Sequence, residues 1–222
     1  MKNANLTPSV RMTPERFAGL WETHTLATRQ SDSRAVYDEL WCRYCEGHRR
    51  YHTTAHIDYC LAQLDLAEHL MGDADAVEMA IWFHDVIYDP GASDNEHQSA
   101  EWFVELAEGY LDPAFVDRVR KLILATIPGR FPQSLDEEFV VDIDLSSFAS
   151  PWPLFKRDSL ALREEFTHLT DKSFFAAQLE FYQSLLERPG LYFTPFFHER
   201  MEYTAIQNIR RYMKELSTKG DI

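Results

Sequence analysis

The sequence is poor in cysteine and glycine, with three cysteines and eight glycines among 222 residues. Cys42 and Cys45 have the spacing of half a zinc knuckle, but only Cys60 remains to complete it. They lie within a helical pattern, so we expect them to be buried structural thiols. The scarcity of glycine favours long regular elements over a loop-rich β-sandwich.

Long hydrophobic runs are also missing. No window approaches the roughly 20 apolar residues of a membrane span. The first eight residues, MKNANLTP, hold no apolar core of the length that a signal peptide needs. With three cysteines and no export signal, the expected compartment is the reducing cytoplasm, away from any membrane.

Positive charge is the third shortage. Twenty-two Lys and Arg residues stand against 36 Asp and Glu, for a formal net charge of −14. Such a surface repels phosphate backbones, which argues against broad nucleic-acid binding. A small phosphorylated molecule, even a nucleotide, is still allowed, because a bound cation reverses the local sign of charge.

Helix-start signals recur at short intervals along the chain. Each combines a capping side chain or a first-turn proline with apolar residues at helical spacing. They occur at Thr13-Pro14, Asp32, Thr53, Asp73 or Asp75, Asp94, Asp112-Pro113, Pro153, Asp171 or Ser173, and Thr194-Pro195. Hydrophobic residues make up 45% of the chain, enough for a sizeable core. Together these features predict an all-α bundle of about eight to ten helices, in one domain spanning residues 1–222.

The segment 139–145, FVVDIDL, is ambiguous. Its β-branched residues and partial alternation suit a strand. The three acidic residues 136–138 look like a charged first turn, so we predict a helix. As a strand, Asp142 and Asp144 would instead resemble the Asp-x-Asp of haloacid-dehalogenase-type phosphatases, a fold that needs strands alternating with helices. The sequence offers no such series.

A few residues carry ligand chemistry. His52 and His56 are four apart at a predicted helix start, and His84-Asp85 follows the apolar run 80–83. A buried His-Asp pair is costly without a partner. If the helices pack antiparallel, His56 and His84-Asp85 meet, and Asp144 from a third helix would complete a mixed nitrogen and oxygen site. Such ligands suit one divalent ion, Mn, Fe, Co, Ni, Zn or Mg.

These residues resemble the H…HD…D signature of the HD-domain superfamily of metal-dependent phosphohydrolases. The likeness extends over five ordered blocks within residues 36–215. They are RRYHTTAHI (49–57), AIWFHDVIY (80–88), DNEHQSA (94–100), DIDLS (142–146) and REEF (163–166). The resemblance implies a single HD-type helical domain that holds metal through His56, His84, Asp85 and Asp144. Asp144 is preferred to Asp142 because it directly precedes Leu145.

The remaining roles follow from the same hypothesis. Glu96 and Asp85 would serve catalysis, and Glu96 would take a proton from a metal-activated water. Substrate contacts are expected from Arg49, His52, Asn95 and Arg163. Other branches of the superfamily bind two metals through extra histidines. Here only His97 lies between the HD pair and the last Asp, so a single ion is expected.

Two functional hypotheses result. The first is hydrolysis of a nucleotide or other small phosphoester by a metal-activated water. The second is an HD-fold protein that binds a metal or a nucleotide without turnover. Composition is compatible with a monomer or a homodimer.

Overall fold

The protein is all-helical. The computed structural model describes residues 10–218, which form ten α-helices and no β-sheet. The predicted all-α bundle of eight to ten helices is therefore confirmed. Residues 1–9 and 219–222, which include the N-terminal segment considered above, lie outside the described residues. The α-helices are α1 (Pro14–Thr23), α2 (Ser33–Tyr44), α3 (Thr54–Ala67), α4 (Ala74–Phe83), α5 (Asn95–Ala107), α6 (Pro113–Ala125), α7 (Leu135–Leu145), α8 (Trp152–Glu165), α9 (Asp171–Leu186) and α10 (Pro195–Thr218).

Side-chain caps start most of these helices. In each case a Ser, Thr or Asp oxygen accepts a hydrogen bond from a backbone N–H of the first turn, which otherwise has no partner within the helix. The capping residues are Thr13, Asp32, Thr53, Asp73, Asp112, Ser134 and Thr170. The Ser134 cap and the acidic residues 136–138 start α7. The ambiguous segment 139–145 is thus helical, and the Asp-x-Asp alternative fails because the described chain has no parallel sheet.

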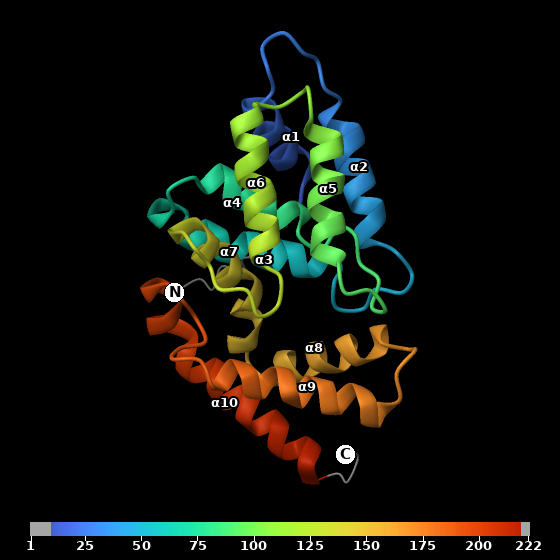
Figure 1. The fold of residues 1–222 in the computed structure, drawn as a ribbon, viewed down its shortest axis with the longest axis vertical. Coiled ribbons are helices and arrows are strands. Elements are labelled where there is room, and N and C mark those ends of the chain that lie inside the picture. Colours follow the sequence, from blue (N-terminus) through green and yellow to red (C-terminus); the bar gives the residue numbers. More distant parts are fainter. Residues whose placement is uncertain (1–9, 219–222) are drawn as a thin grey trace, which may run out of the picture.

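The helices form two bodies joined at a waist (Figure 1). Helices α1–α7 make the upper body, and α8–α10 make the lower one. Two short 3₁₀ helices, η1 (Glu68–Leu70) and η2 (Ser146–Ala149), link neighbouring helices, and η2 connects α7 to the lower body. One continuous cluster of buried hydrophobic residues extends through both bodies, from Met12 to Leu216.

Helix α4 lies at the centre of the upper body. Seven of its ten residues are buried, including Trp82 and Phe83 at its end. A helix that is hydrophobic on all sides packs inside the protein. Full burial of each large side chain stabilises the fold by roughly 2 kcal/mol. The end of α4 is therefore held firmly in place, and His84 and Asp85 directly follow it.

One expectation about the cysteines is wrong. Cys42 and Cys45 are exposed, whereas Cys60 is buried. Helix α2 packs on the core through Tyr37, Leu40 and Tyr44. Cys42 lies between these positions on the turn that faces solvent, and Cys45 follows the last helical residue. The buried face of α2 is therefore formed by tyrosine and leucine side chains, and not by the two thiols.

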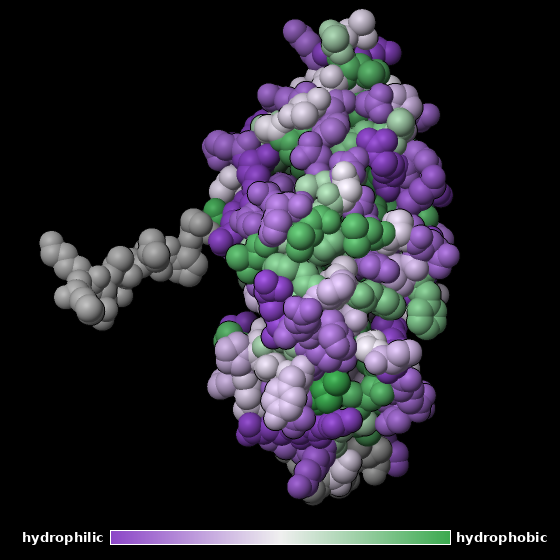
Figure 2. Space-filling view, turned by 90° about the vertical axis from the view of Figure 1, so that its left-hand side faces the viewer, coloured by the Kyte–Doolittle hydropathy of each residue, from purple (hydrophilic) through white to green (hydrophobic). Residues whose placement is uncertain are grey.

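Most of the face drawn in Figure 2 is hydrophilic. Figure 2 shows hydrophobic residues in separate patches on the face it presents, surrounded by polar ones. Exposed large apolar side chains are scattered singly over several elements, among them Leu66, Phe131 and Tyr203. Among the helices of residues 10–218, none combines the length and apolar character needed to cross a bilayer.

Candidate metal centre

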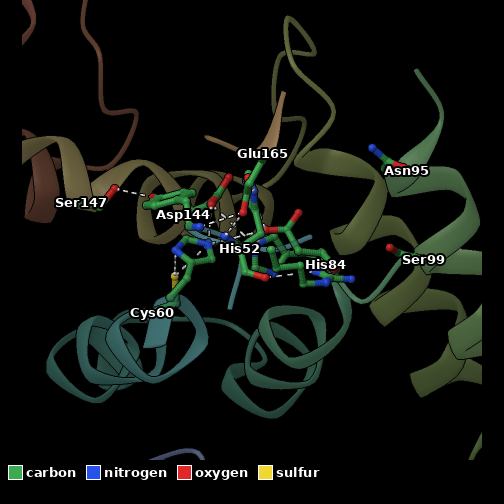
Figure 3. Close-up of polar contacts among 12 residues, drawn as sticks. His52, Cys60, His84, Asn95, Ser99, Asp144, Ser147 and Glu165 are labelled. Carbon is green, nitrogen blue, oxygen red and sulfur yellow. Dashed lines mark hydrogen bonds and ion pairs between the residues drawn. The ribbon is translucent and has the colours of Figure 1, made fainter. Parts of the chain in front are cut away.

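Four side chains from three parts of the chain meet at the bottom of the upper body. His56 lies in the first turn of α3, His84 and Asp85 directly follow α4, and Asp144 is near the end of α7. One ligand atom from each lies within 4.8 Å of all the others. Figure 3 shows the group between the ends of these helices. These are the four residues that the sequence predicts as ligands.

The separations within the group suit a metal ion. The Nε2 atoms of His56 and His84 are 3.4 Å apart. His84 Nε2 lies 3.1 Å from Asp85 Oδ2, and His56 Nε2 lies 3.2 Å from Asp144 Oδ1. Ligand atoms at about 2.1 Å from one ion are separated by roughly 3.0–3.5 Å in octahedral or tetrahedral geometry. The four atoms therefore fit the coordination sphere of a single divalent ion.

Neighbouring groups orient the imidazoles. His84 Nδ1 lies 2.9 Å from the carbonyl oxygen of Ile81, one turn earlier in the chain. A hydrogen donated from Nδ1 to this carbonyl directs Nε2 at the other ligands, which is the usual arrangement for a metal-binding histidine. The thiol of Cys60 contacts the His56 ring from the next turn of α3, with Sγ 3.7 Å from Nε2. The donor set thus has the chemistry that the proposed ion requires.

Charge within the group favours ionised carboxylates. Burial alone would raise the pKa of Asp85, but the neighbouring His84, His52 and His56 lower it strongly. For Asp144, burial is likewise outweighed by hydrogen bonds and charge from His56 and His84, and the pKa falls. Burial lowers the pKa of His84, but Asp85 and Asp144 raise it well above its ordinary value. The raised pKa favours the cationic form of the His84 imidazole beside the two carboxylates.

His52 lies beside the metal ligands and is held by Glu165. Its Nδ1 is 2.7 Å from Glu165 Oε2, and its Nε2 is 4.0 Å from Asp85 Oδ2. Glu165 Oε1 also accepts the backbone N–H groups of Arg50, Tyr51 and His52. Burial would raise the pKa of Glu165, but the hydrogen bond and charge of His52, with these amides, lower it to about 2. Glu165 lies in the REEF block but is not among the site residues predicted from the sequence.

The two aspartates of α7 have different surroundings. Asp144 faces the metal ligands, whereas Asp142 is fully buried on another side of the helix. Asp142 accepts hydrogen bonds from the amides of Phe193 and Thr194 and from the Thr194 hydroxyl. Burial raises the pKa of Asp142 to about 7, although these hydrogen bonds act in the opposite direction. Asp142 thus anchors the start of α10 to α7, and Asp144 is the residue placed to bind metal.

Arg49 lies close to the centre but does not face it. Its side chain is 0% exposed. Its guanidinium donates hydrogen bonds to the carbonyl oxygens of His52, Asp85 and Val86, and its Nε donates to Glu46. In this arrangement it joins the turn before α3 to the turn after α4. The predicted contact of Arg49 with substrate has no support in these positions.

Of the other residues singled out in the sequence, Arg163 points away from the cluster, whereas Asn95 and Glu96 border the cavity beside it. Arg163 pairs with Asp171 and donates to carbonyls of the loop between α8 and α9. Asn95 borders the site, but its amide is bonded to the backbone of Asp89, and Figure 3 shows it apart from the ligands. Glu96 borders the same space. Burial, with the charges of Asp85 and Asp144, raises its pKa. His97 is exposed and does not join the group.

A cavity of about 620 Å³ opens beside the cluster. His52, His84, Asp85, Glu96 and Asp144 line one part of it, and it continues between the upper body and helices α8 and α9. Its volume lies in the usual range of small-molecule sites. Two arginines also line it, Arg130 from the loop after α6 and Arg188 after α9. Sequence analysis did not single them out, because neither belongs to a recognisable motif.

Arg188 is available to a ligand. It lies over the rings of Phe131 and Phe193, and no carboxylate among the described residues pairs with it. Burial lowers its pKa only within a range where it stays protonated. Arg130 donates one hydrogen bond, from Nη1 to the Leu124 carbonyl. The cavity therefore has both acidic metal ligands and free positive charge on its walls.

Comparison with protein-family models, with curated proteins and with solved structures gave no match to this chain. The likeness to HD-domain phosphohydrolases thus depends on the five sequence blocks alone.

Proposed function

We propose that this protein is a metal-dependent phosphohydrolase that acts on a small phosphoester. The observation that carries the proposal is the convergence of two imidazole Nε2 atoms and two carboxylate oxygens within 4.8 Å beside a cavity. A divalent ion held there would polarise a phosphoryl oxygen and lower the pKa of a bound water.

The four residues would surround a bound ion unequally. His84, Asp85 and Asp144 line the cavity, whereas His56 lies behind them and does not. A structural metal site is closed by protein ligands, whereas a catalytic one keeps positions open toward the substrate. The open face of this group is directed at the cavity, which supports a catalytic site.

Glu96 is the best candidate for the proton acceptor. It lines the cavity, and burial with the negative charge of Asp85 and Asp144 raises its pKa. A carboxylate with a raised pKa is a stronger base than one in water and is better matched to neutral pH. Glu96 would take the proton from the attacking water and release it to the leaving alcohol.

Cationic groups would neutralise the phosphoryl oxygens. His52 is held by Glu165 with its other nitrogen directed toward Asp85, so a proton on Nε2 could be donated to a phosphoryl oxygen. Arg130 and Arg188 line the cavity, whereas Arg49 and Arg163 do not. The two cavity arginines are therefore better placed to bind phosphate than the pair expected from the sequence.

The test combines metal content with turnover. Wild-type protein purified without chelator should hold near one equivalent of a divalent metal by elemental mass spectrometry and release phosphate from members of a phosphoester panel. Asp144→Asn should lose both properties, and Asp142→Asn should keep the metal. If the metal-loaded wild-type protein hydrolyses no member of a broad phosphoester panel, the proposed hydrolase activity is refuted.

One observation favours a second candidate, a protein that binds a metal or nucleotide without turnover. Among the described residues the cluster is the only group of metal-binding side chains, so no second ion would assist the reaction. Ligand-dependent thermal stabilisation without product would identify this case. A cytoplasmic location, a nucleotide ligand and the choice between monomer and homodimer are expectations from the sequence that accompany either candidate.

A further inference from the structure

The cavity has a second part that the metal chemistry does not use. It continues between α8 and α9, where its walls are the side chains of Phe155, Leu162, Phe166, Phe174, Phe181 and Leu185. We call this part the apolar chamber. The exposed surface of the cavity as a whole is mainly apolar as well. Apolar walls gain free energy when an apolar group displaces water from them.

Few polar groups in the chamber are available to a ligand. The hydroxyl of Ser159 donates to the Phe155 carbonyl, and Asp158 pairs with Arg157. The Tyr182 hydroxyl lies 3.4 Å from Gln178 Nε2. The exception is Gln178 Oε1, a buried acceptor with no hydrogen-bond partner among the described residues. Gln178 is only 6% exposed and lines the cavity. A buried amide oxygen normally accepts a hydrogen bond, so a donor group on a ligand would supply the partner that Gln178 Oε1 lacks.

We infer that the substrate is a phosphoester of a mainly apolar alcohol, aryl or branched alkyl, with one hydrogen-bond donor in its organic part. Its phosphate would face the cluster, and its organic group would occupy the apolar chamber with the donor on Gln178 Oε1. This inference rests on the proposed function. A nucleoside fits the chamber poorly, because most of its several donors and acceptors would be buried without partners.

Binding of non-hydrolysable probes tests the substrate class apart from turnover. Titration calorimetry on metal-loaded protein would compare naphthylmethylphosphonate, methylphosphonate and the phosphonate analogue of AMP, in which a methylene group replaces the ester oxygen. The naphthyl probe should bind at least about tenfold more tightly than either of the others, because only its ring system fills the apolar chamber. Equal affinities, or the AMP analogue as the tightest ligand, would overturn the inference.

Two variants of α9 localise the effect. Ala177 lines the cavity, so Ala177→Leu should fill part of the chamber and weaken the naphthyl probe about tenfold without changing methylphosphonate. Ser184→Leu adds a similar volume two turns further along the same helix, at an exposed position that does not line the cavity, and should change neither. Naphthyl binding that is unaffected by Ala177→Leu would place the ring elsewhere and refute the assignment.

A third variant tests the proposed hydrogen bond from the ligand to Gln178 Oε1. Gln178→Leu should weaken 2-naphthol, whose hydroxyl can donate to Oε1, more than naphthylmethylphosphonate, which has no donor on its ring. Equal losses for both would mean that Gln178 acts by shape alone and would overturn this part of the assignment.

The proposed hydrolase and the proposed apolar substrate can be refuted independently of each other. Naphthyl preference without phosphate release refutes only the hydrolase, and phosphate release without naphthyl preference refutes only the apolar substrate.

Discussion

Glu165 Oε2 lies 2.7 Å from Nδ1 of His52, although the two residues are 113 positions apart in the chain. The other oxygen of the same carboxylate accepts three consecutive backbone amides, from Arg50 to His52. One buried group at the end of α8 therefore fixes the turn that leads into α3 and His56. The lower body and the metal centre are joined at this point.

Replacing Glu165 should change how stability depends on pH. Its pKa is about 2 in the folded protein, against an ordinary value of 4.5. The folded state therefore favours the ionised form, and this contribution is fully present above about pH 4.5 and lost as the pH falls toward 2. The contribution is at most about 3 kcal/mol. Denaturant unfolding with chelator should show a steep acid decline in wild type that Glu165→Gln flattens.

The neighbouring Glu164 is a matched control, because its side chain is 66% exposed. Glu164→Gln should leave the acid decline as it is in wild type. Equal slopes for wild type and Glu165→Gln would contradict the role given to this carboxylate.

The two aspartates of α7 should differ in their effect on metal binding. Asp144→Asn should abolish metal binding and should also lower the stability of metal-free protein, because the folded protein favours the ionised carboxylate beside His56 and His84. Asp142→Asn should retain the metal but lower the free energy of unfolding by about 1–3 kcal/mol, because the amide cannot accept all three hydrogen bonds from Phe193 and Thr194. Elemental analysis and thermal unfolding would measure both. If only the Asp142 variant lost its metal, Asp142 would be the ligand and Asp144 would not.

Metal binding should release a proton. Asp85 and Asp144 keep His84 protonated in the metal-free protein, and its Nε2 must lose that proton to bind an ion. Affinity should therefore rise about tenfold for each pH unit near neutrality. Calorimetry in buffers with different ionisation enthalpies would count the protons released. A result of no released proton would show that His84 is neutral before the metal binds.

Arg49 should prove to be a structural residue. Arg49→Lys removes donors from buried carbonyls and should lower the free energy of unfolding by about 2 kcal/mol or more. The exposed Arg50 offers a control, and Arg50→Lys should have little effect. If Arg49→Lys kept full stability but raised KM, the substrate contact predicted from the sequence would be restored.

Glu96 should matter for turnover and not for the metal. If the proposed hydrolase is correct, Glu96→Gln should lower kcat by roughly 10²–10⁴ while metal content stays unchanged. Glu105→Gln, on the exposed side of the same helix, should match wild type. Full activity in the Glu96 variant would require another proton acceptor on the cavity wall.

Local signals in the sequence were enough for the fold class and the four clustered ligands. Caps such as Thr53 and Ser134 act within one helical turn, so they are visible in the sequence itself. His56 begins an apolar helix and His84-Asp85 follow one, whereas the resemblance to the H…HD…D signature is what selects Asp144 over Asp142. Antiparallel packing of the helices is a condition that the sequence cannot test, and the structure brings the Nε2 atoms of His56 and His84 to 3.4 Å.

Tertiary partners could not be predicted in the same way. Arg49 and Arg163 looked suitable for phosphate, because a guanidinium in a motif carries no mark of what it will contact. In the structure both are occupied by backbone carbonyls and carboxylates. The apolar chamber arises from residues spread over two helices and their loop. The apolar residues of α8 and α9 have the spacing of any amphipathic helix, so no local sequence pattern predicts a cavity between them.

The order of the chain has a consequence for when the metal can enter. All four ligands precede residue 145, whereas the helices that bound the far side of the cavity, α8 and α9, begin at Trp152 and Asp171. During synthesis on the ribosome, the complete ligand set emerges before those helices exist. An ion could therefore load onto a half-made protein through a wide opening. Glu165 would then dock on the turn at His52 and complete the wall of the site.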